Sequence, residues 1–401
     1  MVDPMRVRVT GPFASYRDGF VEELIAVGYK PECAARQVQL MAHVSRWLQG
    51  QGPDAADLTS SRVAEFLDQR RAEGYRLELS QRGLLPLLGY LRGLGVAPGL
   101  SQPVASTPVE VMMEHYRSYL EAERGLAASS VKRYEGPARL FLSERERADG
   151  LHLGGLTAGE VTDFVVRECR GRRTGSAKVL VTALRSLLRF LFLEGFVSCP
   201  LAQAVPTATG WADRSFPQPL SANEVAALLA SCDRTTLVGS RDFAILTVLE
   251  RLGLRAGEVA TLGLDDFDWR AGEIVVRGKG ASQERLPLPV DVGEAIAAYL
   301  KQRQRVGCRA LFLRVLAPIA ALTSNAVQYV VRGACQRAGL PMAGAHRLRH
   351  HAATAMLAGG ASPAEIGQVL RQARLATTNL YIKVDHGALR TIAQPWPGGA
   401  K

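Results

Sequence analysis

The first half of the chain carries the same helical pattern twice at a nearly constant offset. Residues 11–98 place apolar side chains at helical spacing, and residues 108–198 repeat the same order of features 98–100 residues later. Unrelated four-helix domains also share periodic leucines, but a constant offset across several features favours an internal duplication. We therefore expect a helical domain at residues 1–105 that is a diverged repeat of a second helical domain at residues 106–200.

The composition changes at Pro200, where a proline-rich stretch begins. Four prolines fall between Pro200 and Pro219 without helical periodicity, so residues 201–219 are expected to form a linker. The next domain is expected to span residues 220–390, and residues 391–401 are expected to form a short C-terminal tail.

The residues after the linker mix helices with a short β-structure. They begin with a capping-box sequence at Ser221 and Glu224, which predicts the start of a helix. Further on, two runs of β-type residues, Glu273–Arg277 and Arg285–Pro289, flank the glycine-containing segment Gly278–Ser282. This pattern predicts a hairpin. The expected fold is mainly α, with a small β-hairpin or sheet in this domain.

The chain is basic, and the excess is concentrated in its second half. It holds 49 Lys and Arg residues against 38 Asp and Glu residues, which gives a net charge of +11. Residues 201–401 hold 23 basic and 15 acidic residues, whereas residues 1–200 hold 26 and 23. The excess indicates an anionic partner, most simply nucleic acid, although a solvated basic surface would give the same count.

Cysteine spacing and hydropathy favour a cytoplasmic protein. The six cysteines are scattered and none forms a Cys-x-x-Cys pair, so zinc and redox motifs are not expected. No window approaches the roughly 20 apolar residues of a membrane span, and the first ten residues lack the apolar run of a signal peptide. We expect no membrane segment and no cofactor.

Basic residues gather at two expected helix starts in the second helical copy. Clustering of this kind favours contact with the backbone of duplex DNA, whereas each arginine alone could lie on a solvated helix face. The first copy is nearly neutral, with 12 basic and 11 acidic residues in residues 1–100. The predicted DNA contacts are Lys132, Arg133, Arg172, Arg173, Lys178 and Arg185.

Three segments of the last domain carry polar residues in places that suit chemistry on a phosphate. Arg255 stands between two apolar helices, where it could instead cap a helix by pairing with Glu258. Lys279 stands in the expected hairpin turn, where it could be an ordinary surface lysine. The third segment runs from Ala345 to Tyr381. If its helices fold back, a histidine, an arginine and the final tyrosine can converge on one phosphate.

Taken together, these residues resemble the tyrosine recombinase, or phage integrase, family. Gly253-Leu-Arg255-x-x-Glu258, Lys279 in a turn, His346-x-x-Arg349-His350 and Tyr381 agree with the family pattern in residue type, order and spacing. The resemblance covers roughly residues 108–390. It implies a helical, SAM-like core-binding domain at residues 106–200 and an α+β catalytic domain at residues 220–390.

The resemblance also implies a reaction and a role for each residue. Tyr381 would attack a DNA phosphodiester and store its bond energy as a 3′-phosphotyrosine. Arg255 and Arg349 would bind the non-bridging phosphate oxygens, because planar guanidinium groups match their geometry. His346 would exchange a proton, and Lys279 would protonate the leaving 5′ oxygen. A 5′-hydroxyl from another strand would then attack, so that joining needs no ATP.

One position departs from the family pattern. Nine residues before Tyr381 the family usually has histidine, or sometimes tryptophan, often in Leu-Gly-His, but this chain has Leu370-Arg371-Gln372. Glutamine can donate a hydrogen bond to phosphate but cannot accept and return a proton near neutral pH. We therefore expect Gln372 to position the phosphate or the tyrosine and to do no proton transfer.

Other histidines and tyrosines have simpler interpretations. His346 and His350 stand four apart on an expected helix, as in some zinc sites, but no acidic residue completes a His-Glu-x-x-His pattern, so no metal is expected. His350 is expected to support the site from behind, and His351 to be exposed. Tyr299 and Tyr329 stand at apolar helical spacing and are expected in the core.

The favoured hypothesis is a site-specific recombinase of a mobile genetic element, active in integration, excision or transposition. Two alternatives stay open: a type IB topoisomerase with the same chemistry, and a non-catalytic DNA-binding homologue that assists partner recombinases. Gln372 is the feature in favour of the second alternative. The expected partner is double-stranded DNA, bound as a homotetramer with or without partner recombinases. Residues 1–105 are expected to add site selection or protomer contact.

Overall fold

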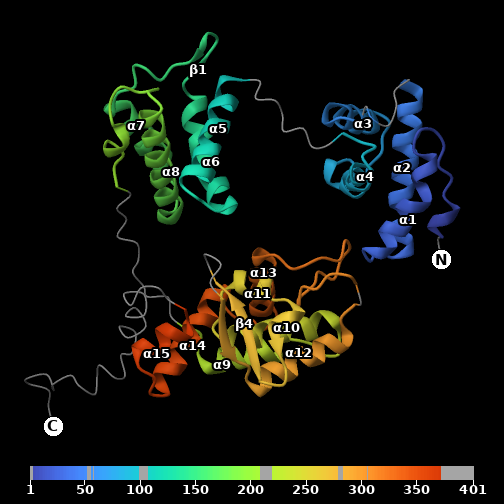
Figure 1. Ribbon diagram of the computed structural model, residues 1–401, viewed down its shortest axis with the longest axis vertical. Coiled ribbons are helices and arrows are strands. Elements are labelled where there is room, and N and C mark those ends of the chain that lie inside the picture. The colour runs from blue at the N-terminus through green and yellow to red at the C-terminus, as the bar shows by residue number, and fades with distance from the viewer. Residues whose placement is uncertain are drawn as a thin grey trace, which may run out of the picture. The chain divides into compact units, whose positions relative to one another are not determined.

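Figure 1 shows the computed structural model of the chain. The structure describes residues 3–51, 56, 58–98, 107–207, 219–278, 283–304 and 306–371. The chain divides into two compact units, one of which contains residues 107–207, while the other contains residues 3–98 and 219–371. Among the residues described, each of the three regions has its own apolar core.

Residues 3–98 form a small helical bundle. Its α-helices are α1 (Arg17–Ala26), α2 (Pro31–Gln51), α3 (Ser60–Ala72) and α4 (Gln81–Gly93), preceded by the 3₁₀ turns η1 (Pro4–Arg6) and η2 (Ala14–Tyr16). The side chains of Phe20, Met41 and Leu87 are fully buried where these helices meet. Thr59 caps α3 by accepting a hydrogen bond from the Arg62 amide.

Pro86 and the nearby glycines predict an irregular helix at Leu84–Leu94, but this prediction is wrong. Pro86 lies inside α4, yet the helix continues on both sides of it. An interior proline costs about 3 kcal/mol, whereas each fully buried leucine contributes about 1.5–3 kcal/mol. The apolar face therefore outweighs the proline and keeps the helix continuous. Its buried residues are Leu84, Leu87, Leu88 and Leu91.

Residues 107–207 also form a helical bundle. Its elements are α5 (Pro108–Ser118), the π-helical turn η4 (Tyr119–Glu123), α6 (Ala128–Ser143), β1 (Glu146–Arg147), β2 (Gly150–Leu151), α7 (Ala158–Cys169), α8 (Thr174–Leu193) and η5 (Leu201–Gln203). The small β1–β2 hairpin was not expected from the sequence. In α8 the buried side is lined by Leu184, Leu187, Leu188 and Leu191, the positions that the helical spacing predicts.

Two pairs of glycines bear on the expected duplication. Gly28 follows α1 and Gly125 follows η4, while Gly95 follows α4 and Gly195 follows α8. All four have positive φ, between +56° and +87°, which favours glycine over other residues. A glycine with positive φ therefore follows the corresponding helices in both bundles. The duplication itself stays a prediction.

Residues 219–371 form a larger helical body with one small sheet. Its helices are α9 (Ala222–Ala230), α10 (Leu237–Arg251), α11 (Ala256–Thr261), α12 (Val290–Gln302), α13 (Ser324–Arg337), α14 (Ala345–Ala358) and α15 (Pro363–Val369), with the turn η6 (Leu264–Asp266). The capping box at Ser221 and Glu224 is confirmed. Helix α10 contacts α12, α13 and α14, so it lies at the centre of this body.

The sheet of this body is antiparallel, in the order β3 (Phe267–Asp268), β4 (Glu273–Arg277) and β5 (Gln283–Pro287). Val275 pairs with Arg285 in the middle of the β4–β5 hairpin. The predicted hairpin is thus confirmed, although its second strand begins two residues earlier than expected. The expected fold, mainly α with a small β-structure, is confirmed as well.

The two tyrosines that were expected in the core have different environments. Tyr299 is fully buried on α12, and its hydroxyl accepts a hydrogen bond from the Leu313 amide at 3.2 Å. Tyr329 is 68% exposed, so this expectation is wrong. The buried stripe of α13 runs through Val327 and Val331, and Tyr329 lies halfway around the helix from it.

Candidate phosphate-binding site

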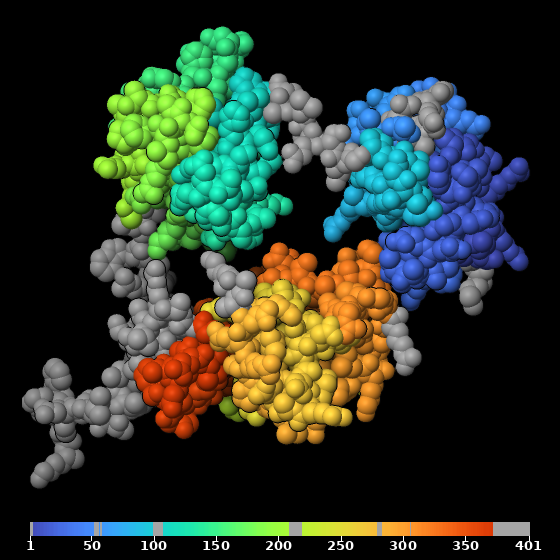
Figure 2. All heavy atoms as spheres, viewed as in Figure 1, coloured from blue at the N-terminus to red at the C-terminus, as the bar shows by residue number. Residues whose placement is uncertain are grey.

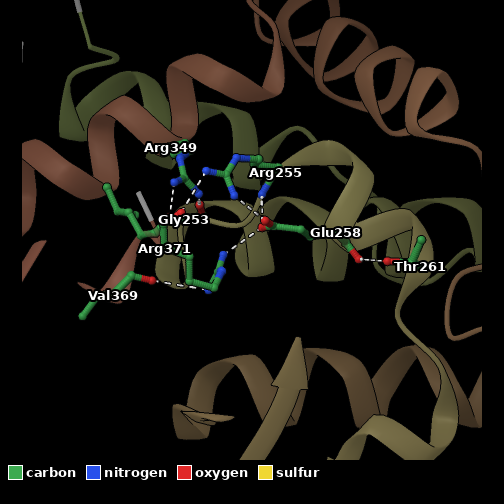
Figure 3. Close-up of polar contacts among 8 residues, drawn as sticks. Gly253, Arg255, Glu258, Thr261, Arg349, Val369 and Arg371 are labelled. Atoms are coloured by element: carbon green, nitrogen blue, oxygen red, sulfur yellow. Dashed lines mark hydrogen bonds and ion pairs between the residues drawn. The ribbon is translucent and has the colours of Figure 1, made fainter. Parts of the chain in front are cut away.

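Arg349 lies on α14 with a residue exposure of only 2%. Its Nη1 donates a hydrogen bond to the Gly253 carbonyl at 2.6 Å, and its Nη2 donates to the Leu370 carbonyl. A buried guanidinium requires such partners, because the loss of hydration is costly. Leu370 follows α15, where helix carbonyls lack partners within the helix. Arg349 thereby joins the segment after α10 to the end of α15 (Figure 3).

Gly253 makes this arrangement sterically possible. It adopts φ = +58°, and a Cβ atom built on it would lie 2.5 Å from Cδ2 of Leu370. Both the backbone conformation and the close approach therefore require glycine. In Figure 2, α14 and α15 form the red patch at the surface of residues 219–371. A small apolar cluster of Ala353, Ile366 and Leu370 connects these two helices.

Arg255 is the residue that caps α11. Its amide donates to Oε2 of Glu258 at 2.8 Å, and its Nη1 donates to Oε1 of the same carboxylate at 2.6 Å. Its Nη2 donates to the Arg371 carbonyl at 3.1 Å. The helix-capping ion pair that the sequence allowed is therefore present. The side chain is nevertheless 45% exposed, so the guanidinium is fixed on one side and open to solvent on the other.

Glu258 is the buried carboxylate of the site, with 6% of its side chain exposed. Burial alone would raise the pKa of Glu258, but the Arg255 amide, the Arg371 guanidinium and the Arg255 guanidinium together hold it below its ordinary value. Glu258 is therefore ionised at neutral pH, and its charge holds both arginines.

Sequence reasoning missed Arg371. Its side chain is only 4% exposed, and its Nη2 donates to Oε2 of Glu258 at 2.8 Å. Its backbone has φ = +52° directly after the Leu370 cap of α15. The usual residue in this conformation is glycine, so an arginine after a helix end was the signal that could have drawn attention to it.

His346 and His350 stack edge to face on α14, with ring centroids 4.2 Å apart. Burial, followed by the charges of Arg349 and Arg255, lowers the pKa of His346. Burial, followed by His346, Arg349 and Arg347, lowers the pKa of His350 to about 4. Both rings are therefore neutral at pH 7, and His346 can accept a proton there. The expected place of His350 behind His346 fits its burial.

His351 is not simply exposed, as the sequence led us to expect. Its Nδ1 lies 2.6 Å from the Leu220 carbonyl, and this hydrogen bond ties α14 to the residue that precedes the α9 cap. The partner stands 131 residues away in the chain, so local sequence carries no sign of this contact.

The structure brings together three of the six predicted catalytic residues. The ring of His346 lies within electrostatic reach of Arg255 and Arg349, and both arginines bind the Leu370-Arg371 backbone. The other three predicted residues lie outside the described residues: Lys279, Gln372 and Tyr381. Their roles stay predictions.

The predicted DNA contacts in residues 107–207 have mixed surroundings. Lys132, Arg133, Arg173 and Lys178 are exposed. Arg172 donates to the Glu168 carboxylate at 2.7 Å. Arg185 is half-buried, and its Nη2 donates to the Val205 carbonyl at 2.8 Å. Arg185 therefore has a role within the bundle beside any role in binding.

The described part of the chain holds no candidate metal site and no candidate membrane span. Within it, no group of three or more His, Cys, Asp or Glu side chains is placed to hold a metal ion. None of the described helices combines the length and the hydropathy that crossing a membrane requires.

The chain is similar to known integrases and recombinases along most of its length. Residues 218–387 match the model of the phage integrase family. Over 397 residues the chain is 40% identical to a putative integrase/recombinase, y4rA, of Sinorhizobium fredii, a match that covers 98% of this chain and 96% of the relative. It is 30% identical to the tyrosine recombinase XerD of Mycobacterium tuberculosis, over 72% of this chain and 96% of XerD.

Solved structures show the same fold. The site-specific recombinase XerH, bound to a palindromic difH substrate, matches 98% of this chain and 98% of its own with a TM-score of 0.55 at 17% identity. A lambda integrase dimer bound to a core site matches 72% of this chain with a TM-score of 0.53. With a 40% identical relative along nearly its whole length, the chain belongs to the phage integrase family of tyrosine recombinases.

Proposed function

We propose that this chain is a site-specific DNA recombinase that cleaves and rejoins DNA strands through a 3′-phosphotyrosine at Tyr381. Members of its family are DNA breaking–rejoining enzymes. The observation that carries the proposal is the pair of arginines, Arg255 and Arg349, which come from distant segments and donate to the adjacent backbone carbonyls of Arg371 and Leu370. Their fixed guanidinium groups suit the non-bridging oxygens of one phosphodiester.

The first step exchanges one phosphate ester bond for another. The phenolic oxygen of Tyr381 attacks phosphorus and gives up its proton, for which neutral His346 is the proposed acceptor. A bond from this oxygen to phosphorus forms, and the bond to the 5′ oxygen breaks. The leaving oxygen takes a proton, for which Lys279 is the proposed donor. In the second step a 5′-hydroxyl attacks the phosphotyrosine and releases the tyrosine, so the bond energy is conserved and no nucleotide cofactor is consumed.

The arginines stabilise the charge that develops on the phosphate during both steps. Arg255 has a solvent-facing side that a phosphate can reach, whereas Arg349 is buried and strengthens the local positive potential. Charges that are fixed before the reaction need no reorganisation during it, which is why such groups lower barriers. Neutral His346 completes the set as the residue that can take up and return a proton near pH 7.

Gln372 is proposed to position the phosphate or Tyr381, since it cannot transfer a proton. The proposed partner is duplex DNA, and the proposed assembly is a homotetramer on that DNA, with or without partner recombinases. Several of the matching structures are of recombinases bound to DNA. Integration, excision or transposition of a mobile element is the proposed biological setting, and residues 1–105 are proposed to select the site or to contact another protomer.

A covalent adduct tests the proposal directly. Duplexes that tile the DNA flanking the gene are nicked at successive positions, so that the fragment with the 5′-hydroxyl is lost after cleavage and the protein–DNA adduct accumulates. We expect wild type to form an adduct with one of these duplexes and Tyr381→Phe to form none. The duplex that gives the adduct is called the site duplex below.

The same experiment distinguishes the proposed recombinase from the non-catalytic alternative, which the glutamine at position 372 favours. A protein that only assists partner recombinases would bind one of the duplexes without forming an adduct. Tight binding by wild type with no adduct on any nicked duplex would refute the enzymatic proposal and support the assisting role.

A further inference from the structure

Glu258 is shared by two arginines that come from opposite sides of it (Figure 3). Its Oε1 accepts from Arg255, and its Oε2 accepts from Arg371. The side chains of Glu258 and Arg371 are almost fully buried, at 6% and 4% exposure, whereas that of Arg255 is 45% exposed. The exposed arginine is therefore held from inside by a buried ion pair.

Arg371 occupies an unfavourable backbone conformation to reach this place. Its φ of +52° brings the Cβ atom close to the backbone, a conformation in which glycine is far more common. Such strain persists where the surroundings over-determine it, and here the side-chain bond to Glu258 does so. The same residue also accepts a hydrogen bond from Arg255 through its carbonyl. Arg371 thus contacts both members of the Arg255–Glu258 pair.

Because Glu258 is shared with Arg371, Arg255 can direct more of its positive charge towards a phosphate. If Glu258 paired with Arg255 alone, its negative charge would offset much of the guanidinium charge and draw that group inward. Because Arg371 donates to the second carboxylate oxygen, Glu258 has a positively charged partner inside the protein. Arg255 keeps its alignment while more of its charge acts outward.

We propose that Arg371 is a positioning residue for Arg255: by sharing Glu258 and presenting its carbonyl, it fixes the guanidinium that binds the scissile phosphate. This inference rests on the proposed function, because it assigns Arg371 a part in the same phosphate chemistry. In a simpler role, Arg371 would only anchor the end of α15 to α11. The two roles differ in whether the rate of strand cleavage depends on the charge of residue 371.

The test uses the full-length protein and the site duplex. Arg371→Met should lower the rate of adduct formation about 10- to 100-fold, while the Kd for the duplex changes less than about threefold. Arg371→Lys should recover part of the rate, because it keeps the charge beside Glu258 but lacks the planar fork. Arg371→Gly removes the side chain and suits φ = +52°, so it should slow cleavage as Arg371→Met does without backbone strain.

A background variant shows whether Arg371 acts through Arg255. In an Arg255→Lys protein, Arg371→Met should lower the remaining rate less than about threefold, because the group that it positions is already altered. Arg270→Met is the matched control, since Arg270 is exposed and its loss removes the same charge from residues 219–371. It should leave the rate within about twofold of wild type.

Three results would overturn the inference. These are an unchanged rate in Arg371→Gly, equal losses of rate and affinity in Arg371→Met, and a full additional loss in the Arg255→Lys background. Failure of the proposed function looks different, because wild type itself would then form no adduct. Melting curves recorded before each assay restrict the comparison to temperatures at which every variant is folded.

Discussion

Residues 107–207 and residues 219–371 use arginine in opposite ways. In residues 219–371, the side chains of Arg349 and Arg371 are buried, and they donate to backbone carbonyls and to Glu258. In residues 107–207, Arg173 and Lys178 lie exposed at the start of α8. A buried guanidinium has one fixed direction, whereas an exposed basic side chain supplies charge without a fixed geometry.

This difference separates two kinds of contact with a phosphate. Binding along a duplex backbone needs positive charge in roughly the right place, and it tolerates mobile side chains. Stabilising a reacting phosphate needs donors that stand in place before the reaction begins. We therefore expect changes in the buried set to alter rate and stability, and changes in the exposed set to alter affinity and its salt dependence.

Arg349→Ala should give the largest effect. It removes the buried charge that is proposed to stabilise the reacting phosphate, and it leaves the Gly253 and Leu370 carbonyls without their partner. We expect the rate of adduct formation to fall by about 1,000-fold or more, and local stability to fall by about 2–4 kcal/mol. Adduct assays and hydrogen exchange of the α14 and α15 amides measure the two effects. Weaker DNA binding at an unchanged cleavage rate would contradict the contrast between the regions.

Gly253→Ala tests the backbone that receives Arg349. Alanine is strained at φ = +58°, and its Cβ would lie 2.5 Å from Leu370. Strain and overpacking together should lower local stability by about 2–3 kcal/mol, read from the exchange of the same amides. Gly257→Ala is the matched control, since a Cβ there meets nothing within 4 Å and φ is not positive. In α11 it should be neutral or slightly stabilising. Equal effects of both substitutions would refute this explanation.

Local sequence signals predicted the parts of the fold that depend on neighbouring residues. The capping box at Ser221 and the β4–β5 hairpin were predicted because a few adjacent residues determine them. Arg255 and Arg349 could be proposed because their motifs have a recognisable spacing. Their mutual placement depends on the tertiary fold, which brings Gly253 and Leu370 to the same guanidinium.

Contacts across long stretches of chain escaped prediction. Arg371 reaches Glu258 across 113 residues, so no pattern around either residue indicates the pair. The exposure of Tyr329 escaped for a different reason: its spacing is compatible with a helix, but the packing of α13 decides which side faces inward. The sequence thus indicated which residue types the site contains, whereas tertiary packing determines which of these residues hold one another in place.

The buried histidine should make the stability of α14 depend on pH. The pKa of His350 is about 4 in the folded protein, below the ordinary value of about 6.5 for an unfolded chain. Between these values the unfolded chain binds the extra proton, so the stabilisation is complete above about pH 6.5 and is lost as the pH falls towards 4. We expect wild type to lose about 1–2 kcal/mol more than His350→Asn over this range.

Hydrogen exchange of the α14 amides, corrected for the intrinsic effect of pH on exchange, measures this difference. His351→Asn is a useful comparison, because His351 stands beside His350 in the chain but its Nδ1 bonds to the Leu220 carbonyl. If His350→Asn and wild type lose stability in parallel, the titration of His350 does not stabilise α14.

The smallest effect should come from the basic residues of α8, where Lys178 lies near the start of the helix and Arg185 lies about two turns further on. Lys178→Ala should weaken binding of the site duplex about two- to fivefold and reduce the salt slope by about one, without loss of stability.

Arg185→Ala should instead lower the stability of the bundle by about 1 kcal/mol, because Arg185 donates to the Val205 carbonyl and to the Thr207 hydroxyl. Binding isotherms at several salt concentrations measure the effect on DNA binding, and hydrogen exchange of α8 measures the effect on stability. If Arg185→Ala also reduces the salt slope by one, this arginine contacts DNA from a partly buried position, and the division between exposed binding residues and buried positioning residues does not hold for residues 107–207.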